Sequence, residues 1–298
     1  MTRSLEVDRS ELADTTQPDQ LADLLIQQLI PQLPQLLPLP IEDVAKACGI
    51  VEIQPLDTDA FEGGLIQDEN KVRGFVLVRA GALPERTRFT IAHELGHFVN
   101  LRHVAPPGEA RLLCNASDLK YSGAQGDYRH GMEAQANEFA AHLLMPACIL
   151  KKQSFLAGTV ELSRIFALQR MCNVSKQAAA RRYAELHGGD FAVVFTKDGR
   201  VARAPLRSGD FPWLSLKTGQ TVHREALTRT FVGSDGDVSD QEESEAAWWL
   251  DSGAQADEWS IWEEVLVQRD GYRMTLLLAE RNVDSYRQHR ERWTPTLR

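Results

Sequence analysis

The sequence has 298 residues, of which 43% are hydrophobic and 25% charged, the mix of a globular protein with enough apolar material for a core. The N-terminus is polar and acidic, and no apolar run approaches the length of a membrane span, so we expect a cytoplasmic protein without a secretion signal. Its 4 cysteines are widely spaced, which argues against a disulfide framework or a structural zinc ribbon.

The net charge of −9 comes from one segment. Of the 42 Asp and Glu residues, eleven lie between Phe231 and Glu264, where no Lys or Arg occurs. The remaining 31 nearly balance the 33 Lys and Arg residues. The overall charge therefore gives no support for a general nucleic-acid-binding protein.

Changes in pattern along the chain predict an α+β protein with four parts. Residues 1–20 carry no hydrophobic period, and we expect a flexible tail there. Residues 21–150 combine helical and strand patterns and form the first domain. Residues 151–189 hold two short helical patterns with helix-turn-helix proportions, and residues 190–298 turn to short strands, which predicts a separate α+β domain.

Within the first domain, a turn at 68–70 separates two strand patterns, as in a β-hairpin. The second of these strands, Gly74 to Arg79, is a candidate for pairing with an extended substrate. A helix is expected from Pro84 to Arg102 and another from about Met132 to Met145. The polar residues 108–129 between the helices are interpreted as a long loop.

The strongest chemical signal is His93-Glu94-Leu95-Gly96-His97. In a helix, positions four apart lie on one face, so His93 and His97 present their imidazoles together and can bind one divalent metal. Glu94 lies beside the first of them, where it can take a proton from water activated by the metal. The alternative is a core helix that carries two histidines without a metal.

A catalytic zinc usually has three protein ligands, and two residues compete for the third position. His103 extends the pattern to His-x-x-x-His-x-x-Asn-x-x-His, and Asn100 stands where metzincins have a glycine that ends the helix. Glu133 lies on the apolar face of the second helix, with Ala136, Ala140, Leu143 and Leu144. A carboxylate that points into an apolar interior is costly unless it is paired or bound to metal, which favours Glu133.

These motifs resemble those of the ImmA/IrrE metallopeptidase family. The resemblance rests on the run from Glu85 to His97 and on the pattern Glu133-x-x-Ala136-Asn137-x-Phe139-Ala140-x-x-Leu143-Leu144-Met145-Pro146. It covers about Leu21 to Pro146. The order of the later segments is similar to that of the radiation-response regulators in this family, which carry a GAF-like C-terminal domain.

The resemblance implies a zincin-like metallopeptidase domain in which His93, His97 and Glu133 bind the metal and Glu94 is the general base. It implies zinc as the cofactor, with Mn²⁺ as an alternative. It also implies an endopeptidase that cleaves a repressor of the Xre type and so releases stress or DNA-damage response genes. The GAF-like domain is expected to bind a small molecule. The alternative function is a non-proteolytic, DNA-binding regulator with a relic metal site.

Three residues in or beside the predicted loop are candidates for stabilising the oxyanion or contacting substrate: Tyr121, Tyr128 and His130.

A basic group in the helical segment has two interpretations. Lys176, Arg181 and Arg182 lie on one helical pattern and suit either DNA contact or a solvated helix face. Three basic residues make a small footprint for phosphates, which favours the solvated face. Tryptophans interrupt the acidic segment, and we expect them to anchor it on the C-terminal domain: Trp248, Trp249, Trp259 and Trp262.

Overall fold

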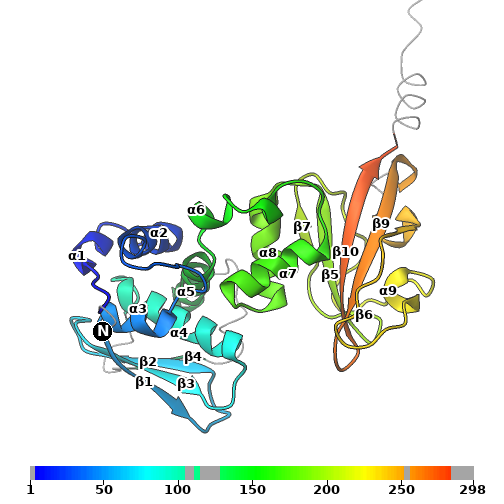
Figure 1. Ribbon diagram of the computed structural model, residues 1–298. Coiled ribbons are helices and arrows are strands. Elements are labelled where there is room, and N and C mark those ends of the chain that lie inside the picture. The colour runs from blue at the N-terminus through cyan, green and yellow to red at the C-terminus, as the bar shows by residue number, and fades with distance from the viewer. Residues whose placement is uncertain (1–3, 105–110, 115–127, 252–255, 283–298) are drawn as a thin grey trace, which may run out of the picture. The chain divides into compact units, whose positions relative to one another are not determined.

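The computed structural model describes residues 4–104, 111–114, 128–251 and 256–282 (Figure 1). The chain divides into two compact units. Unit 1 comprises residues 1–153 and 168–178, and unit 2 comprises residues 154–167 and 179–298. Both units combine helices with a sheet, which confirms the α+β class.

The described part of unit 1 contains a four-stranded sheet with the order β1-β3-β2-β4. Strand β1 pairs in parallel with β3, whereas β3–β2 and β2–β4 are antiparallel. The turn between β2 and β3 includes Asp68 to Asn70, so the predicted hairpin is confirmed. The strands are β1 (Ile50–Leu56), β2 (Gly63–Gln67), β3 (Gly74–Arg79) and β4 (Arg111–Cys114).

Strand β3 does not have a free edge. It pairs with β1 along one side and with β2 along the other, over Gly74 to Val78. An extended substrate cannot add to a strand whose backbone groups are already paired. The expectation that Gly74 to Arg79 receives a substrate strand was therefore wrong.

Helices cover one face of this sheet in two layers (Figure 1). Helices α3 and α4 contact the strands, and α2 and α5 lie farther from the sheet, with α5 packed against both α4 and α2. The helix bounds are α2 (Pro18–Leu29), α3 (Ile41–Ala47), α4 (Pro84–Val99) and α5 (Tyr128–Leu144). Pro18 and Pro84 start their helices at positions where a missing backbone N–H costs nothing.

The contact between α4 and α5 depends on a glycine. A Cβ atom added at Gly96 would lie 2.9 Å from Cδ1 of Phe139, whose side chain is buried. Real Cβ atoms do not approach other atoms so closely, so only glycine lets the aromatic ring of α5 lie against the backbone of α4.

Residues 4–20, expected as a flexible tail, instead pack on unit 1. They carry the short helix α1 (Arg9–Leu12), in which Leu12 is buried, and helix α2 already begins at Pro18. Glutamines on and after α2 hold the backbone of this segment, since Gln28 and Gln32 bond to Asp8 and Glu6. The polar composition did not predict these contacts, because they are made by side-chain amides and not by an apolar stripe.

Helix α4 ends three residues earlier than expected, at Val99. Lys71, from the hairpin turn, donates through Nζ to the carbonyl oxygens of His97 and Asn100, each at 2.7 Å. These contacts satisfy carbonyls at the helix end that have no partner within the helix. Burial of the Lys71 ammonium, with Arg9 nearby, lowers the pKa of Lys71 to about 8.

The expected loop at 108–129 is partly regular structure. Residues 111–114 form β4, and helix α5 begins at Tyr128 instead of about Met132. The error arose because a four-residue edge strand is too short to show a period.

The helical segment after α5 is shared between the units. It comprises α6 (Ala147–Leu150), the 3₁₀ turn Ser154–Leu156, α7 (Leu162–Cys172) and α8 (Lys176–His187). Asn173, between α7 and α8, has a φ of 51°, a conformation that Asn tolerates better than most residues. Arg88 of α4 donates to the carbonyl oxygens of Asn173 and Leu39, so this turn is attached to α4 within unit 1.

The described part of unit 2 is built on a sheet in which the strands run in the order β6-β5-β10-β9-β8, with β7 also paired to β5. The described pairs are antiparallel. The strands are β5 (Phe191–Lys197), β6 (Arg200–Val201), β7 (Leu206–Ser208), β8 (Glu242–Ser244), β9 (Trp259–Val267) and β10 (Tyr272–Arg281), and the short helices are α9 (Leu227–Thr230), Ala246–Trp248 and Ala256–Glu258.

Three of the four tryptophans and part of the acidic segment belong to the core of unit 2 or pack against it. Trp249 is fully buried, and Trp248 and Trp259 pack against the same cluster, which confirms that these rings anchor the segment. Glu263 is buried as well, and accepts hydrogen bonds from Trp249 Nε1 and from the backbone and hydroxyl of Thr228. The acidic run is therefore partly internal structure rather than only a solvated surface.

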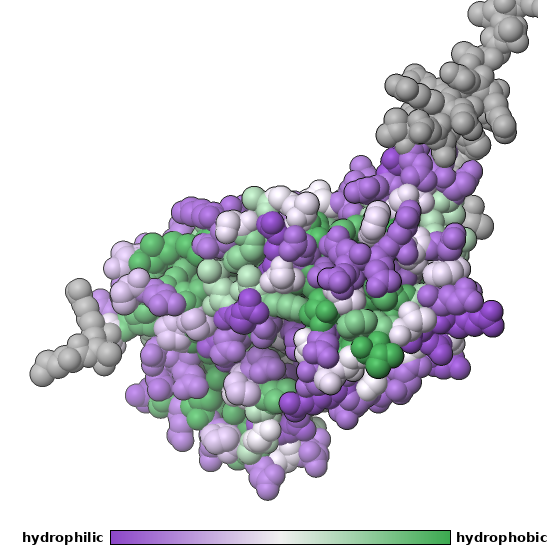
Figure 2. All heavy atoms as spheres, turned by 45° about the vertical axis from the view of Figure 1, so that its right-hand side comes forward, coloured by the Kyte–Doolittle hydropathy of each residue, from purple (hydrophilic) through white to green (hydrophobic). Residues whose placement is uncertain are grey.

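Hydrophilic and hydrophobic residues are intermingled on the face shown in Figure 2. Among the residues that the structure describes, no helix is both long and apolar enough to cross a membrane.

We predict that Gly96→Ala destabilises unit 1. The new methyl group collides with Phe139, and such overpacking costs about 1–3 kcal/mol, more than the helix propensity gained. Gly131→Ala is the matched control, since it adds the same methyl group to an exposed position of α5 with no atom within 4 Å. Calorimetry of the full chain should show a lower melting temperature than the wild type for Gly96→Ala and an unchanged melting temperature for Gly131→Ala. Equal stability of the two variants would contradict the packing argument.

Candidate metal centre

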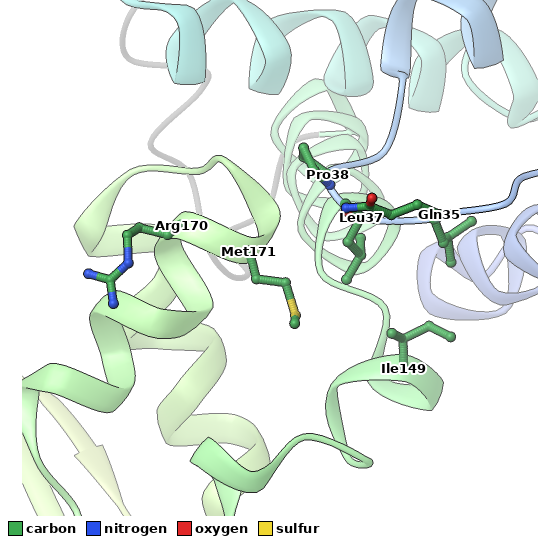
Figure 3. Close-up of a pocket in the computed structure, with 7 residues that line it drawn as sticks. Gln35, Leu37, Pro38, Ile149, Arg170 and Met171 are labelled. Carbon is green, nitrogen blue, oxygen red and sulfur yellow. The ribbon is translucent and has the colours of Figure 1, made fainter.

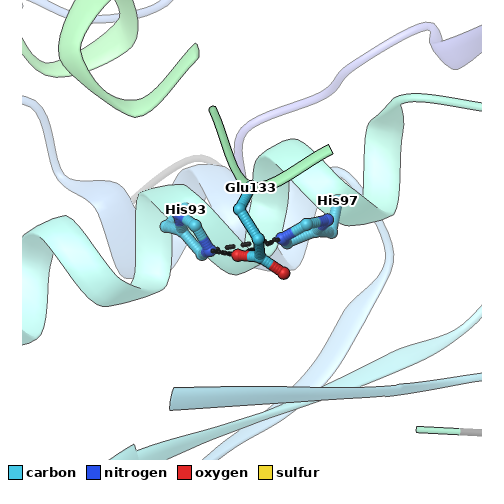
Figure 4. Close-up of side chains that lie close together, drawn as sticks. All are labelled: His93, His97 and Glu133. Carbon is cyan, nitrogen blue, oxygen red and sulfur yellow. Dashed lines mark hydrogen bonds and ion pairs between the residues drawn. The ribbon is translucent and has the colours of Figure 1, made fainter. Parts of the chain in front are cut away.

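Three side chains from α4 and α5 converge on one point (Figure 4). Nε2 of His93 lies 3.1 Å from Oε2 of Glu133, and Nε2 of His97 lies 3.4 Å from the same oxygen. The two Nε2 atoms are 3.2 Å apart. The sequence pattern predicted that both histidines lie on one face of a helix and that Glu133 points inward. The structure brings all three side chains together, as Figure 4 shows.

The cluster is buried: His93 and His97 are 0% exposed, and Glu133 is 2% exposed. Burial lowers the pKa of His97 to about 4, so its imidazole is neutral at pH 7. Burial alone raises the pKa of Glu133, but its contacts with His93 and His97 outweigh that effect and hold the pKa well below its ordinary value. A neutral imidazole at His97 and an ionised carboxylate at Glu133 are the protonation states that a metal requires of these two ligands.

The second nitrogen of His93 shows where its proton lies. Nδ1 is 3.0 Å from Oδ1 of Asn137, one turn after Glu133 on α5. An amide oxygen only accepts, so Nδ1 of His93 can donate its proton to Asn137, and the lone pair of Nε2 is then available to a metal that Glu133 also binds. A metal-binding histidine typically donates its other N–H in this way.

The separations of the three donor atoms match those around one metal ion. Zn–N and Zn–O bonds of about 2.0–2.1 Å in a tetrahedral site place the ligand atoms roughly 3.3 Å apart. The separations in the cluster are 3.1, 3.2 and 3.4 Å. The donor set of two imidazoles and a carboxylate therefore fits a divalent metal such as zinc.

His103 has a role that neither sequence alternative described. Its Nδ1 lies 3.0 Å from Nδ1 of His97, and its Nε2 lies 2.9 Å from Oε1 of Gln135. Both ring nitrogens are thus engaged away from the cluster, so His103 is not placed as the third ligand. Because α4 ends at Val99, the chain turns back and buries His103 beside His97 instead of carrying it away along the helix.

Glu94 is fully buried under strand β2. A Cβ atom at Gly63 would collide with Cγ2 of Thr90 and would lie 2.7 Å from Oε1 of Glu94. The glycine therefore makes the space that the Glu94 carboxylate occupies.

Of the residues expected to contact substrate, Tyr121 lies outside the described residues. Tyr128 and His130 belong to the first turn of α5, in a part whose side chains the structure does not describe. Their proposed roles stay predictions.

The basic residues of the helical segment do not form one solvated face. Arg182 is buried and pairs with Glu185 at 2.9 Å, whereas Arg181 is exposed. The expectation of a solvated face was therefore wrong for Arg182, whose side chain is buried and paired with Glu185.

A separate cavity of about 420 Å³ lies in unit 1 (Figure 3). Its lining is largely apolar and contains none of the three cluster residues: Gln35, Leu36, Leu37, Pro38, Ile149, Arg170 and Met171.

Sequence reasoning missed several residues of the site. Asn137 and Gln135 hold the outer nitrogens of histidines, Gly63 makes room for Glu94, and Lys71 ends α4. Asn137 had a visible signal, because it lies four residues after Glu133 on the same helix. The contacts of the other three depend on strand register and on the end of α4, which a single sequence does not reveal.

We predict that Glu133→Gln weakens Zn²⁺ binding by more than about 100-fold, beyond the usual cost of losing an outer-shell partner. His103→Gln should change it little, since His103 is not a ligand and the glutamine oxygen can still accept from His97. Competition with a chromophoric chelator measures both affinities. A severe loss in His103→Gln with near-normal binding in Glu133→Gln would reverse the assignment.

Comparisons with known proteins agree with this site. Residues 49–183 match the Peptidase M78 family, described as the IrrE N-terminal-like domain. Among solved structures, a Mycobacterium tuberculosis transcriptional regulator is similar in fold, with a TM-score of 0.55 and 13% identity over 91% of this chain and 79% of that chain. No curated protein matches the chain in sequence. The matched residues 49–183 contain all three cluster residues, so the metal centre lies within the part of the chain that is similar to the IrrE N-terminal-like domain.

Proposed function

We propose that the protein is a metal-dependent endopeptidase that regulates transcription by cleaving a repressor of the Xre type. The observation that carries the proposal is the convergence of His93, His97 and Glu133, with donor separations that fit a zinc ion. The family match over residues 49–183 supports peptidase chemistry at this site.

A divalent metal held by these three residues would supply Lewis acidity, polarising the scissile carbonyl and making water acidic enough to deprotonate near pH 7. The carboxylate of Glu94 takes a proton from the attacking water. It then gives this proton to the amide nitrogen as the peptide bond breaks, so that the amine leaves neutral. Its burial under Gly63 keeps the carboxylate in one place throughout.

The regulatory part of the proposal rests on the resemblance of the motifs and on the organisation of the chain. Cleavage of the repressor would release stress or DNA-damage response genes. Unit 2, as a GAF-like domain, would bind a small molecule that controls cleavage. The similarity in fold to a mycobacterial transcriptional regulator is compatible with a regulatory protein.

The DNA-binding alternative has little support. Of the three basic residues on α8, Arg182 is buried against Glu185 and is not available to phosphates. We therefore do not propose that α8 reads DNA.

The central experiment is to incubate the purified protein with each Xre-type repressor encoded in its own genome, with Zn²⁺, with Mn²⁺ and with chelator. We expect one repressor to be cut at one bond only when metal is present. Absence of any cut across the full set, with a metal-loaded protein, would contradict the proposal.

We predict that Glu94→Gln retains the metal but reduces cleavage about 10²–10⁴-fold, as expected for loss of a general base. The amide keeps the size of the carboxylate but does not accept the proton of the attacking water. Metal content and cleavage rate are measured on the same preparation. Near-normal cleavage would remove Glu94 from the mechanism.

Gly63→Ala should give a similar result by a different route. The added methyl group displaces the carboxylate of Glu94 without touching a cluster residue, so we expect normal Zn²⁺ affinity and slow cleavage. Gly131→Ala is the control, because it adds a methyl group in open space on α5. Gly81→Ala would not serve, because the φ of 71° at this position strains any side chain. Unchanged cleavage in Gly63→Ala would show that Glu94 tolerates the displacement.

A further inference from the structure

The outer nitrogens of the cluster lead into a chain of hydrogen bonds that the peptidase motif does not include. Nδ1 of His97 contacts Nδ1 of His103, and Nε2 of His103 contacts Oε1 of Gln135. Both imidazoles are at most 1% exposed, so water does not compete for the contact between them. The distances, 3.0 and 2.9 Å, are those of ordinary hydrogen bonds.

The direction of this chain is fixed at its far end. Asn100 Nδ2 also points at Oε1 of Gln135, at 3.5 Å. The orientation of Asn100 is set independently, since its Nδ2 donates to the carbonyl of Thr16 and its Oδ1 accepts from the backbone N–H of Arg102. The atom of Gln135 that faces His103 is therefore the amide oxygen, which accepts and never donates.

The positions of the protons on the two imidazoles then follow from this oxygen. His103 donates from Nε2 to Gln135, and a neutral imidazole has one N–H, so Nδ1 of His103 is bare. That bare nitrogen can accept the Nδ1 proton of His97, which leaves the lone pair of Nε2 for a metal that Glu133 also binds. In the metal-free protein, Glu133 lies 3.4 Å from Nε2 and competes for the same proton, so His103 and Glu133 attract it to opposite sides of the ring.

We propose that His103 and Gln135 are positioning residues that hold His97 in the Nδ1–H tautomer and so keep its Nε2 open to the metal. The proposal rests on the metal site of the proposed function, but the tautomers are a property of the metal-free protein. His103 thereby acts on the metal through His97, without being a ligand.

Two substitutions at the exposed position 135 test the direction of the chain. Gln135→Glu keeps an acceptor, whereas Gln135→Lys offers only donors and should reverse both tautomers. In the full-length, metal-free protein, long-range ¹H–¹⁵N spectra of histidine side chains should show His97 protonated at Nδ1 in the wild type and Gln135→Glu, and at Nε2 in Gln135→Lys. Zn²⁺ affinity should fall about 10–100-fold in Gln135→Lys only.

A second pair separates hydrogen bonding from packing. His103→Leu fills the site without an acceptor and should weaken Zn²⁺ binding about 10–100-fold, whereas His103→Gln should restore most of it. A charge effect at position 135 would change affinity but leave the tautomers as in the wild type, and that result would overturn the proposal. So would a wild-type His97 protonated at Nε2. Expected tautomers in a protein that cleaves no repressor would contradict the proposed function alone.

Discussion

The close approach of α5 to α4 is the constraint on which the site depends. Glycine at position 96 lets the ring of Phe139 lie against the backbone of α4, and this contact sets the distance at which Glu133 meets His93 and His97. The helix motif alone supplies two nitrogens, because positions four apart share a face. The third donor and the partner of His93 both come from α5, so the packing of two helices, rather than either sequence motif, completes the donor set.

The end of α4 is a second constraint, and it acts on the other histidine. Lys71 binds the carbonyls of His97 and Asn100, which stops the helix and turns the chain back. His103 is thereby buried against His97 instead of passing into solvent on a further turn. A hairpin turn from the sheet thus determines which group faces the outer nitrogen of His97. The two histidines consequently have different outer partners, an amide oxygen for His93 and a second imidazole for His97.

The parts that the sequence predicted are those that a local pattern determines. The helical face of His93 and His97, the inward direction of Glu133 and the hairpin around Asp68 all follow from periodicity and turn chemistry, and the structure agrees with them. The helix end at Val99, the place of β3 inside its sheet and the role of Gly63 depend on contacts between residues far apart in the chain. The prediction of a flexible N-terminal tail was wrong for a related reason, because amide side chains farther along the chain form hydrogen bonds with the polar backbone of this segment.

Two buried carboxylates, Glu133 in the cluster and Glu94 next to His93 in the sequence, favour the proposed chemistry over a relic site. Glu133 has a reason to be ionised, since two imidazoles face it and a cation fits between them. Glu94 is not a member of that cluster, yet it is fully buried, and a glycine on the neighbouring strand leaves room for it. Burying a carboxylate costs more free energy than burying an apolar side chain of similar volume. A structural helix would be more stable with an apolar residue at position 94, so the space kept for a carboxylate there favours the proposed role of Glu94 as a general base over a purely structural one.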